Sequence, residues 1–454
     1  MWLVSITLTS HAQKVQQKIP QKTRILFLLD GSGSMLAKWE RNRLRIDIAK
    51  EVLSNLVDSL RTNKDLELAL RVYGHQFGRE KKNCRDTRLE VGFGENNHDA
   101  IINRLQLVKP KGTTPIAFSL EQAANDFPVD KNFRNIIIII TDGIESCDGD
   151  PCDVSLALQR KNIFLKPFVI GLGMSLEYEK QFKCVGKFFD GSDISNFNKA
   201  LNQALETTLS TTTVSVELLD INDRKTESNV NVTFLNNFTR EPAYEFVHYR
   251  DTNGRPDSVE IDGVLTYDLI VNTTPPVIKR NVPIRPGKHN VIEIKSPQGF
   301  LQVNQRGHQS YRHGVNILVR EAGKRAVINV QPISDLEKYL VGEYDLEVTT
   351  LPRRYFRKVK VNQSNTTKIA IKDPGLVNIY NNAPGYGSIY EIKSNGKEEW
   401  VANLEENKSK SSLALQPGKY KIAFRAKNAQ GSKFTTIKSI TVRSGETTTI
   451  NLFD

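Results

Sequence analysis

The stretch from Asp30 to Met35 (DGSGSM) places one carboxylate and two hydroxyls on a short, glycine-rich segment. Its side-chain oxygens belong to Asp30, Ser32 and Ser34, and hard divalent cations such as Mg²⁺ prefer oxygen ligands. The apolar run Ile25–Leu29 directly precedes the segment and is typical of a buried strand in a parallel sheet. The segment is therefore a candidate cation-binding loop, with a solvated Asp-Gly turn as the alternative.

A second buried strand is predicted to carry another carboxylate to the same place. The isoleucine run Ile136–Ile140 is followed by Thr141 and Asp142. In open α/β sheets, ligands bind at the edge where the carboxyl ends of the parallel strands meet. We therefore expect Asp142 to lie near Asp30, within reach of the loop Gly112–Pro115.

The elements that would position these loops alternate between strands and helices. Apolar spacing predicts helices at 42–60, 99–107, 153–161 and 192–209, a further helix that follows Pro115 and ends at 126, and strands at 66–73, 89–93 and 163–170. Such alternation predicts an α/β domain built on a doubly wound, mostly parallel, Rossmann-like sheet.

The segment from about Gln21 to Leu209 resembles a von Willebrand factor type A (VWA) domain. The resemblance rests on the DGSGS loop, the Gly-x-Thr-Pro loop at 112–115 and the Thr-Asp-Gly strand end at 141–143. It implies a metal-ion-dependent adhesion site formed by Asp30, Ser32, Ser34, Thr114 and Asp142. The expected ion is Mg²⁺, with Mn²⁺ or Ca²⁺ as alternatives, and one coordination position is left for a carboxylate of a protein partner.

Two details of this resemblance leave alternatives open. Thr113 neighbours Thr114, and we prefer Thr114 because it directly precedes the proline. The segments 71–75 (RVYGH) and 145–152 (ESCDGDPC) are similar to signatures of extracellular bacterial members. Asp148 and Asp150 would then add negative charge beside the metal or bind a second cation, although a solvated acidic loop tied by a disulfide is the favoured interpretation.

The N-terminus and the cysteines both point to export. Residues 1–12 resemble a secretory signal peptide that lacks the positively charged n-region, and a frayed apolar terminus is the alternative. No other stretch has the ~20 apolar residues of a membrane-spanning helix. The chain is therefore predicted to be secreted, periplasmic or attached to the cell surface. In such compartments disulfides are expected, and the four cysteines allow three pairings. The cysteines are Cys84, Cys147, Cys152 and Cys184, of which Cys147 and Cys152 are close enough in sequence to pair locally.

The charge balance does not indicate a nucleic-acid partner. The 454-residue chain has a formal net charge of +12, but its Lys and Arg residues are scattered among Asp and Glu. No His or Cys spacing typical of a zinc site occurs, and no hydrolase, P-loop or nucleophile motif is present. We therefore predict no catalytic residues and a protein that is not an enzyme.

The second half of the chain is a repeat. Short alternating apolar runs replace the helical pattern, and Tyr267-Asp268-Leu269 recurs at 344–346 and 420–422. The predicted organisation is a signal peptide at 1–12, a VWA domain at 20–209, a linker at 210–213 that opens the first β-module, and three all-β, sandwich-like modules at 210–297, 298–373 and 374–454. The modules resemble carboxypeptidase-regulatory-like or PEGA-like modules, which serve as stalks.

These features predict an exported binding or adhesion protein that engages an acidic group of a protein partner through its metal. A structural cell-envelope protein with a fold-stabilising metal is one alternative. A carbohydrate-binding protein is another, with Trp400, Tyr380 and Tyr390 as a stacking platform. Packing of these aromatic side chains in the module core or across strands is the favoured interpretation.

Overall fold

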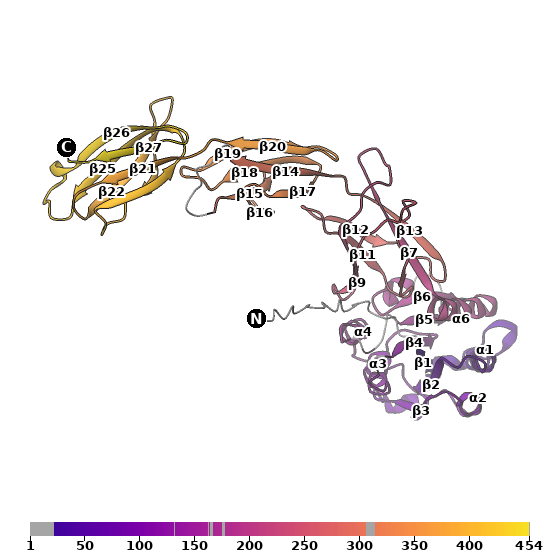
Figure 1. Cartoon of the computed structure of the whole chain (residues 1–454). Helices are drawn as coiled ribbons and strands as arrows, with labels where there is room; N and C mark the ends of the chain where they lie inside the picture. The colour runs from indigo at the N-terminus through magenta and orange to yellow at the C-terminus, as the bar shows by residue number, and fades with distance from the viewer. Residues whose placement is uncertain are drawn as a thin grey trace, which may run out of the picture. The chain divides into compact units, whose positions relative to one another are not determined.

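The N-terminal domain is built on one six-stranded sheet with the order β3-β2-β1-β4-β5-β6 (Figure 1). The computed structural model describes residues 22–130, 132–161, 163, 167–174, 178–305 and 314–453. The strands are β1 (Lys22–Asp30), β2 (Leu66–Tyr73), β3 (Thr87–Gly94), β4 (Phe133–Thr141), β5 (Phe168–Leu172) and β6 (Lys187–Gly191). All neighbours pair in parallel except β2 and β3, so the predicted mostly parallel sheet is confirmed.

The two central strands, β1 and β4, are buried on both faces. Alternate residues of a strand point to opposite faces. Phe27 and Ile138 therefore join the apolar cluster on one face, while Leu28 and Ile139 join the cluster on the other. This explains why the two strands are apolar without interruption and not alternating.

Helices cover both faces of the sheet. They are α1 (Arg45–Ser59), α2 (His98–Leu107), α3 (Ile116–Ala123), α4 (Pro151–Arg160), α5 (Glu179–Phe182) and α6 (Ile194–Leu209). Buried residues of α1, α2 and α6 belong to one apolar cluster, and those of α3, α4 and α5 belong to the other. The domain is thus doubly wound, as predicted.

Several element starts and the linker differ from the prediction, and the largest shift is that of β5, which begins at Phe168 and not at 163. The helix expected from residue 42 begins at Arg45, because Arg41 and Asn42 have the left-handed φ angles of 53° and 62°. Helix α6, predicted from 192, begins at Ile194 and is capped by the Asp193 carboxylate, which accepts the Asn196 N–H. The expected linker 210–213 is shorter, since the β-branched Thr212 already begins a strand.

Three modules of identical topology follow, and each contains a three-stranded and a four-stranded sheet (Figure 1). Module 1 contains β7 (Thr212–Leu219), β8 (Asn231–Asn236), β9 (Pro242–Val247), β10 (Val259–Ile261), β11 (Tyr267–Val271), β12 (Val277–Val282) and β13 (His289–Lys295). Module 2 contains β14 (Gln298–Gln305), β15 (Asn316–Glu321), β16 (Asn329–Pro332), β17 (Leu336–Leu340), β18 (Gly342–Val348), β19 (Arg354–Val361) and β20 (Thr366–Ile371). Module 3 contains β21 (Gly375–Tyr380), β22 (Gly385–Ile392), β23 (Glu398–Asn403), β24 (Lys410–Leu415), β25 (Gly418–Ala426), β26 (Thr436–Val442) and β27 (Thr447–Asn451).

The repeated tyrosine has the same role in every module. Tyr267, Tyr344 and Tyr420 lie on the fifth strand of their modules and are buried. Each hydroxyl donates to a backbone carbonyl four or five residues earlier in the chain. A large apolar ring is thereby buried without leaving its hydroxyl unpaired.

None of the helices in the described part of the chain combines the length and the hydropathy needed to span a bilayer. The predicted signal peptide at 1–12 lies outside the described residues.

Replacing Tyr344 by Phe should destabilise module 2 by about 0.5–1.5 kcal/mol, because the Leu340 carbonyl loses its hydrogen bond. Hydrogen exchange of module 2 amides would measure this locally, since a chain of several domains does not unfold in one step. Tyr355→Phe is the matched control, because Tyr355 is 56% exposed on the same module. Equal exchange rates in the two variants would contradict the assigned role.

Candidate metal centre

Asp30 ends β1 at the carboxyl edge of the sheet, and both of its side-chain oxygens have donors. Oδ1 accepts the Ser32 N–H at 2.8 Å, and Oδ2 accepts the Thr141 hydroxyl at 2.7 Å. The loop then turns away at Gly31, where a Cβ would lie only 2.8 Å from the Tyr73 carbonyl oxygen. Glycine is therefore required there, and the buried Asp30 carboxylate is held in one orientation.

The two loop hydroxyls connect this segment to the end of β4. The Ser32 and Ser34 hydroxyl oxygens are 2.9 Å apart, and the Ser34 hydroxyl donates to Asp142 Oδ1 at 2.7 Å. Parallel pairing of β1 with β4, up to Leu29 beside Ile140, brings the two strand ends together. Four of the five predicted site residues thus form one contiguous set of oxygens.

The loop that carries Thr114 lies against the same segment. The Gly33 N–H donates to the Gly112 carbonyl at 3.0 Å, and Ser32 forms an isolated parallel bridge with Gly112. The Thr113 hydroxyl donates to the Asn83 carbonyl at 2.9 Å and so ties this loop to another one. That commitment favours Thr114, which is buried, as the residue facing the site.

Thr114 itself is clamped by the loop that follows β4. Its N–H donates to the Ser146 hydroxyl at 2.8 Å, and its carbonyl accepts the Ser146 N–H at 3.1 Å. One residue earlier, the Glu145 carboxylate accepts the Ala117 N–H at the start of α3. The segment 145–152 is similar to a family signature, but no pattern in it predicts this supporting role of Ser146 and Glu145.

Arg45 is a further residue of the site that no sequence pattern predicts. From the first turn of α1, its guanidinium donates to Asp142 Oδ2 at 2.8 Å. No local pattern signalled this pair, because α1 and the end of β4 are distant in sequence. The Arg45 charge offsets one of the two buried carboxylates and leaves the other without a full counter-charge.

The electrostatics of the pair fit a divalent cation. Burial and the nearby Asp142 carboxylate raise the pKa of Asp30 to about 6. Among the described residues, no three His, Cys, Asp or Glu side chains gather in a way that could hold a metal. The donor set is therefore two carboxylates completed by hydroxyls, which suits an oxygen-preferring ion such as Mg²⁺ better than Zn²⁺ with its nitrogen and sulfur ligands.

The disulfides are Cys84–Cys147 and Cys152–Cys184, so the local pairing of Cys147 with Cys152 is wrong. Cys152 lies in the first turn of α4, whereas Cys147 lies in the preceding loop beside Ser146, which bonds to Thr114. Asp150 is the cap of this helix and accepts the Cys152 N–H at 2.8 Å. Its carboxylate caps the helix, and Asp148 is exposed in the loop before it.

The Cys84–Cys147 disulfide joins the two supports of the Thr114 loop. Asn83, which accepts the Thr113 hydroxyl, precedes Cys84, and Ser146, which clamps Thr114, precedes Cys147. The covalent bond therefore lies one residue from each support. The disulfide thus restrains both residues that hold Thr113 and Thr114 in place.

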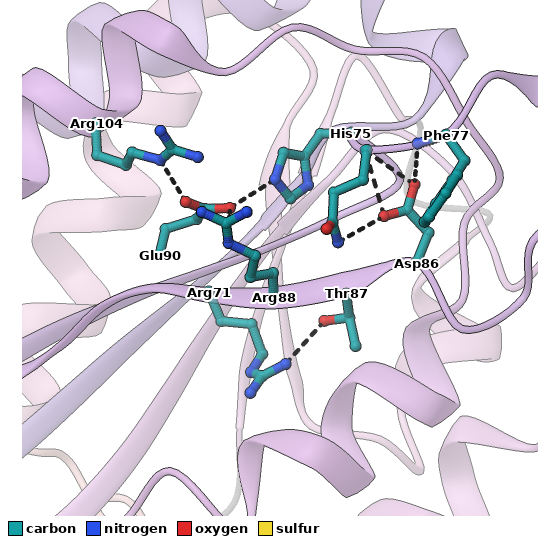
Figure 2. A network of polar contacts seen from close by, with 9 residues as sticks. Arg71, His75, Phe77, Asp86, Thr87, Arg88, Glu90 and Arg104 are labelled. Carbon is teal, nitrogen blue, oxygen red and sulfur yellow. Dashed lines mark hydrogen bonds and ion pairs between the residues drawn. The ribbon is translucent and has the colours of Figure 1, made fainter.

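A polar network that includes His75, Glu90 and Arg104 lies next to the metal-site loop, and Figure 2 shows the side chains of this network. His75 Nε2 lies 2.7 Å from Glu90 Oε1, and Arg104 pairs with the other oxygen of Glu90. Although burial alone would raise it, the bonds from Arg104 and His75 hold the pKa of Glu90 below its usual value. A Cβ on Gly31 would lie 2.9 Å from the His75 Cβ, so this network packs directly under the metal-site loop.

Asp86 shapes the adjoining loop in the same network. Its carboxylate accepts the backbone N–H groups of Gln76 and Phe77 at 3.0 and 3.1 Å (Figure 2). The Phe77 carbonyl and the Asp86 carboxylate face Gly112, where a Cβ would lie 2.7 and 3.2 Å from them. The segment 71–75, predicted as a family signature, thus leads into a loop that supports the Thr114 loop.

Comparison with known proteins agrees with this architecture. Residues 25–203 match the model of the von Willebrand factor type A domain. The uncharacterized protein YwmD of Bacillus subtilis is 30% identical over 207 residues, which are 43% of this chain and 89% of YwmD. The uncharacterized protein YwmC of the same organism is 29% identical over 185 residues, covering 40% of this chain and 79% of YwmC.

Two solved structures are also similar. BatB from Bacteroides thetaiotaomicron is 19% identical with a TM-score of 0.32, covering 40% of this chain and 97% of BatB. The pilus adhesin SpaC from Lactobacillus rhamnosus GG is 10% identical with a TM-score of 0.34, covering 93% of this chain and 82% of SpaC. On the match of residues 25–203 and the similarity to YwmD, this chain belongs to the von Willebrand factor type A domain family.

Proposed function

We propose that this protein is an exported surface or periplasmic binding protein that engages an acidic group of a protein partner through a divalent cation. The observation that carries the proposal is the contact of the Ser34 hydroxyl with both Ser32 and Asp142, beside the buried Asp30. Asp30, Ser32, Ser34, Thr114 and Asp142 would hold the ion, which is Mg²⁺ in this proposal, and Mn²⁺ and Ca²⁺ are the alternatives.

The cation would supply a positive charge with one coordination position open to a carboxylate of the partner. The residues of the chain keep the remaining donors in place. Asp30 is oriented by Thr141, and Asp142 is oriented by Arg45 and Ser34. Exposure of Ser34, in contrast to the buried Asp30, leaves the site accessible from its serine side.

Export is part of the proposal and is supported by the two disulfides of the VWA domain, since disulfides persist in oxidising compartments. The three modules, which resemble carboxypeptidase-regulatory-like or PEGA-like modules, would act as a stalk that holds the site away from its attachment point. We propose no enzymatic activity, because the Ser34 hydroxyl that bonds to Asp142 is a proposed ligand of the cation, and the sequence contains no hydrolase, P-loop or nucleophile motif.

A structural envelope protein whose metal only stabilises the fold is the competing function. The two differ in whether a partner binds when the metal is present. Both require metal binding, so the variants below are compared for metal binding first and for partner binding second.

Ser34→Ala should weaken Mg²⁺ binding by about tenfold or more while leaving the fold intact, because Ser34 is exposed and its hydroxyl joins Ser32 to Asp142. Isothermal titration with MgCl₂, MnCl₂ and CaCl₂ measures this, and Asp30→Ala should abolish binding. Asp148→Ala is the matched control, since it removes an exposed carboxylate from the neighbouring loop.

Partner binding is then measured by pulldown from cell-envelope extracts with Mg²⁺ or with a chelator. A protein captured by wild type and by Asp148→Ala only with Mg²⁺, and not by Ser34→Ala, supports the proposal. Metal binding that raises the melting temperature without capturing any partner favours the structural function. Unchanged metal affinity in Asp30→Ala would refute both.

The stabilisation by Mg²⁺ should depend on pH through Asp30. The pKa of Asp30 is about 6 in the folded metal-free protein, against 3.8 in the unfolded chain. Protonation of Asp30 therefore stabilises the folded metal-free protein. This contribution to the free energy of unfolding, about 3 kcal/mol, is fully present below about pH 3.8 and is lost as the pH rises through about 6. A cation requires the ionised carboxylate, so the rise in melting temperature with Mg²⁺ should be larger at about pH 7.5 than at about pH 5. The same rise at both pH values would contradict this role, and Asp30→Asn is the control that removes the titration.

The Cys84–Cys147 disulfide should matter for the metal site, and the Cys152–Cys184 disulfide should not. Replacing either pair by serines should cost about 2–4 kcal/mol of stability. Only the loss of Cys84–Cys147 frees the supports of Thr113 and Thr114, so only this variant should bind Mg²⁺ about tenfold or more weakly. Titration calorimetry with MgCl₂ below the melting temperature of both variants tests this. Equal Mg²⁺ affinities of the two variants would show that the metal site does not need the Cys84–Cys147 disulfide.

A further inference from the structure

The outer face of the four-stranded sheet in module 3 carries aromatic side chains that do not belong to the module core. On β25, the side chains of Tyr420, Ile422 and Phe424 are buried, so the intervening residues face outward. The neighbouring β22 presents Tyr386 and Tyr390 on this outer face, and Tyr390 pairs across to Trp400 of β23. Tyr386 is 46% exposed and Trp400 is 60% exposed.

The predicted set of Trp400, Tyr380 and Tyr390 is therefore only partly brought together. Tyr380 lies on β21 in the other sheet of the module, and its ring contacts the Lys410 ammonium at 4.8 Å. Tyr386 takes its place on the face with Trp400 and Tyr390. We call the face formed by Tyr386, Ser388, Tyr390, Trp400 and Arg425 the module 3 platform.

A hollow of about 250 Å³ lies between the two tyrosines of the platform. Its centre is open because the two residues that pair there, Ser388 and Ala423, are small. Arg425 pairs with Tyr386 across the strands, and its guanidinium lies 5.6 Å from the ring centroid. The hollow is lined by Tyr386, Gly387, Ser388, Tyr390, Ala423, Phe424, Arg425 and Thr435, of which Arg425 is the only charged residue.

The side chain of Trp400 is also held in place. Its indole N–H donates to Asn403 Oδ1 at 3.1 Å, and the Ser388 hydroxyl donates to the same oxygen at 2.8 Å. A fixed aromatic ring loses little conformational freedom when a ligand stacks on it. The Ser388 hydroxyl, which lines the hollow, and the Trp400 ring are thus joined through one oxygen of Asn403.

Module 2 shows that the shared fold does not require such a face. By strand register, the position of Ala423 in module 3 is that of Glu347 in module 2, and the position of Lys421 is that of Asp345. Glu347 is buried and pairs with Arg320 and Arg353, so ion pairs fill the site of the hollow.

The Asp at the second position also has a structural role in the other two modules. Asp345 accepts the Lys358 N–H, and Asp268 of module 1 accepts the Asn281 N–H. Both donors have left-handed φ angles, of 52° and 51°. In module 3 the corresponding residue is Lys421, and the strand pair β25–β26 runs without a bulge. Module 3 thus lacks the carboxylate-to-backbone bond that the other two modules have at this position, and Lys421 pairs with Glu398.

We propose that the module 3 platform binds an acidic glycan, with a sugar ring in the hollow against Tyr386 and Tyr390, the chain continuing over Trp400, and a carboxylate of the sugar at Arg425. The C–H faces of sugar rings stack on aromatic rings, while their hydroxyls need the hydrogen-bonding groups that Ser388 and the tyrosines offer. Arg binds planar carboxylates through paired N–H groups. Sites that enclose a whole drug-sized ligand measure about 300–1,000 Å³, so a hollow of about 250 Å³ suits one ring of a longer chain.

The test uses the full chain and three uronate polymers, namely polygalacturonate, alginate and hyaluronan, titrated in the presence of a chelator. The chelator and the Ser34→Ala background exclude binding through the VWA metal site, so failure of this proposal is distinguishable from failure of the proposed function. Tyr386→Ala and Trp400→Ala keep the net charge and should each weaken binding by about fivefold to tenfold. Wild type should bind polygalacturonate more tightly than its methyl ester, which has no free carboxylate, and Arg425→Gln should bind the two equally.

Tyr355→Ala is the matched control, because this exposed tyrosine of module 2 also lies under an arginine, with the Arg357 guanidinium 5.7 Å from its ring. It should bind as wild type does. Two outcomes would mean that the polymer is attracted only by the positive charge of the chain, which would contradict the proposal. One is equal affinity of Tyr386→Ala, Trp400→Ala, Arg425→Gln and Tyr355→Ala for the uronate polymers. The other is an affinity for inorganic polyphosphate as high as that for the uronate polymers. Absence of binding to all three polymers would overturn the proposal. It would also be overturned if the wild-type chain sedimented as a dimer and Tyr386→Ala as a monomer, because the platform would then be an interface between two copies of the chain.

Discussion

Two negative charges are brought together at the carboxyl edge of the VWA sheet, and much of the domain serves to hold them there. Asp30 and Asp142 follow two buried strands that pair in parallel, so the fold itself sets their separation. Without a cation, the repulsion and the burial appear as a raised pKa of Asp30. Arg45 offsets part of this charge, and the hydroxyls of Ser34 and Thr141 occupy carboxylate oxygens. An ion with two positive charges is the natural complement of what remains.

The supports of this site are as specific as its donors. Thr113 and Thr114 are held by two different loops, and those loops are joined covalently by Cys84–Cys147. Behind them, Asp86 fixes the turn that faces Gly112, and the His75–Glu90 pair packs under Gly31 (Figure 2). Metal ligands on loops need such support, because a loop without it would lose conformational entropy whenever the ion bound.

The three modules show how one scaffold can carry different surfaces. Their strand order is the same, and a buried tyrosine closes each core with a bond to a backbone carbonyl. The outward residues on the same strands are free of that constraint. Module 2 fills this face with ion pairs around Glu347, whereas module 3 leaves a hollow beside Tyr386. A stalk and a binding surface are therefore compatible with the same core.

Features that depend on neighbouring residues could be predicted from the sequence. The apolar runs predicted β1 and β4, the DGSGS and Thr-Asp-Gly segments predicted the carboxylates at their ends, and the recurring tyrosine predicted the modules. Contacts between residues that are distant in the chain became visible only in the fold. It pairs Arg45 with Asp142, Cys84 with Cys147, and Tyr386 with the platform in place of Tyr380. These contacts join elements far apart in the chain, and their geometry follows from strand order and helix packing, which no local pattern of residue types records.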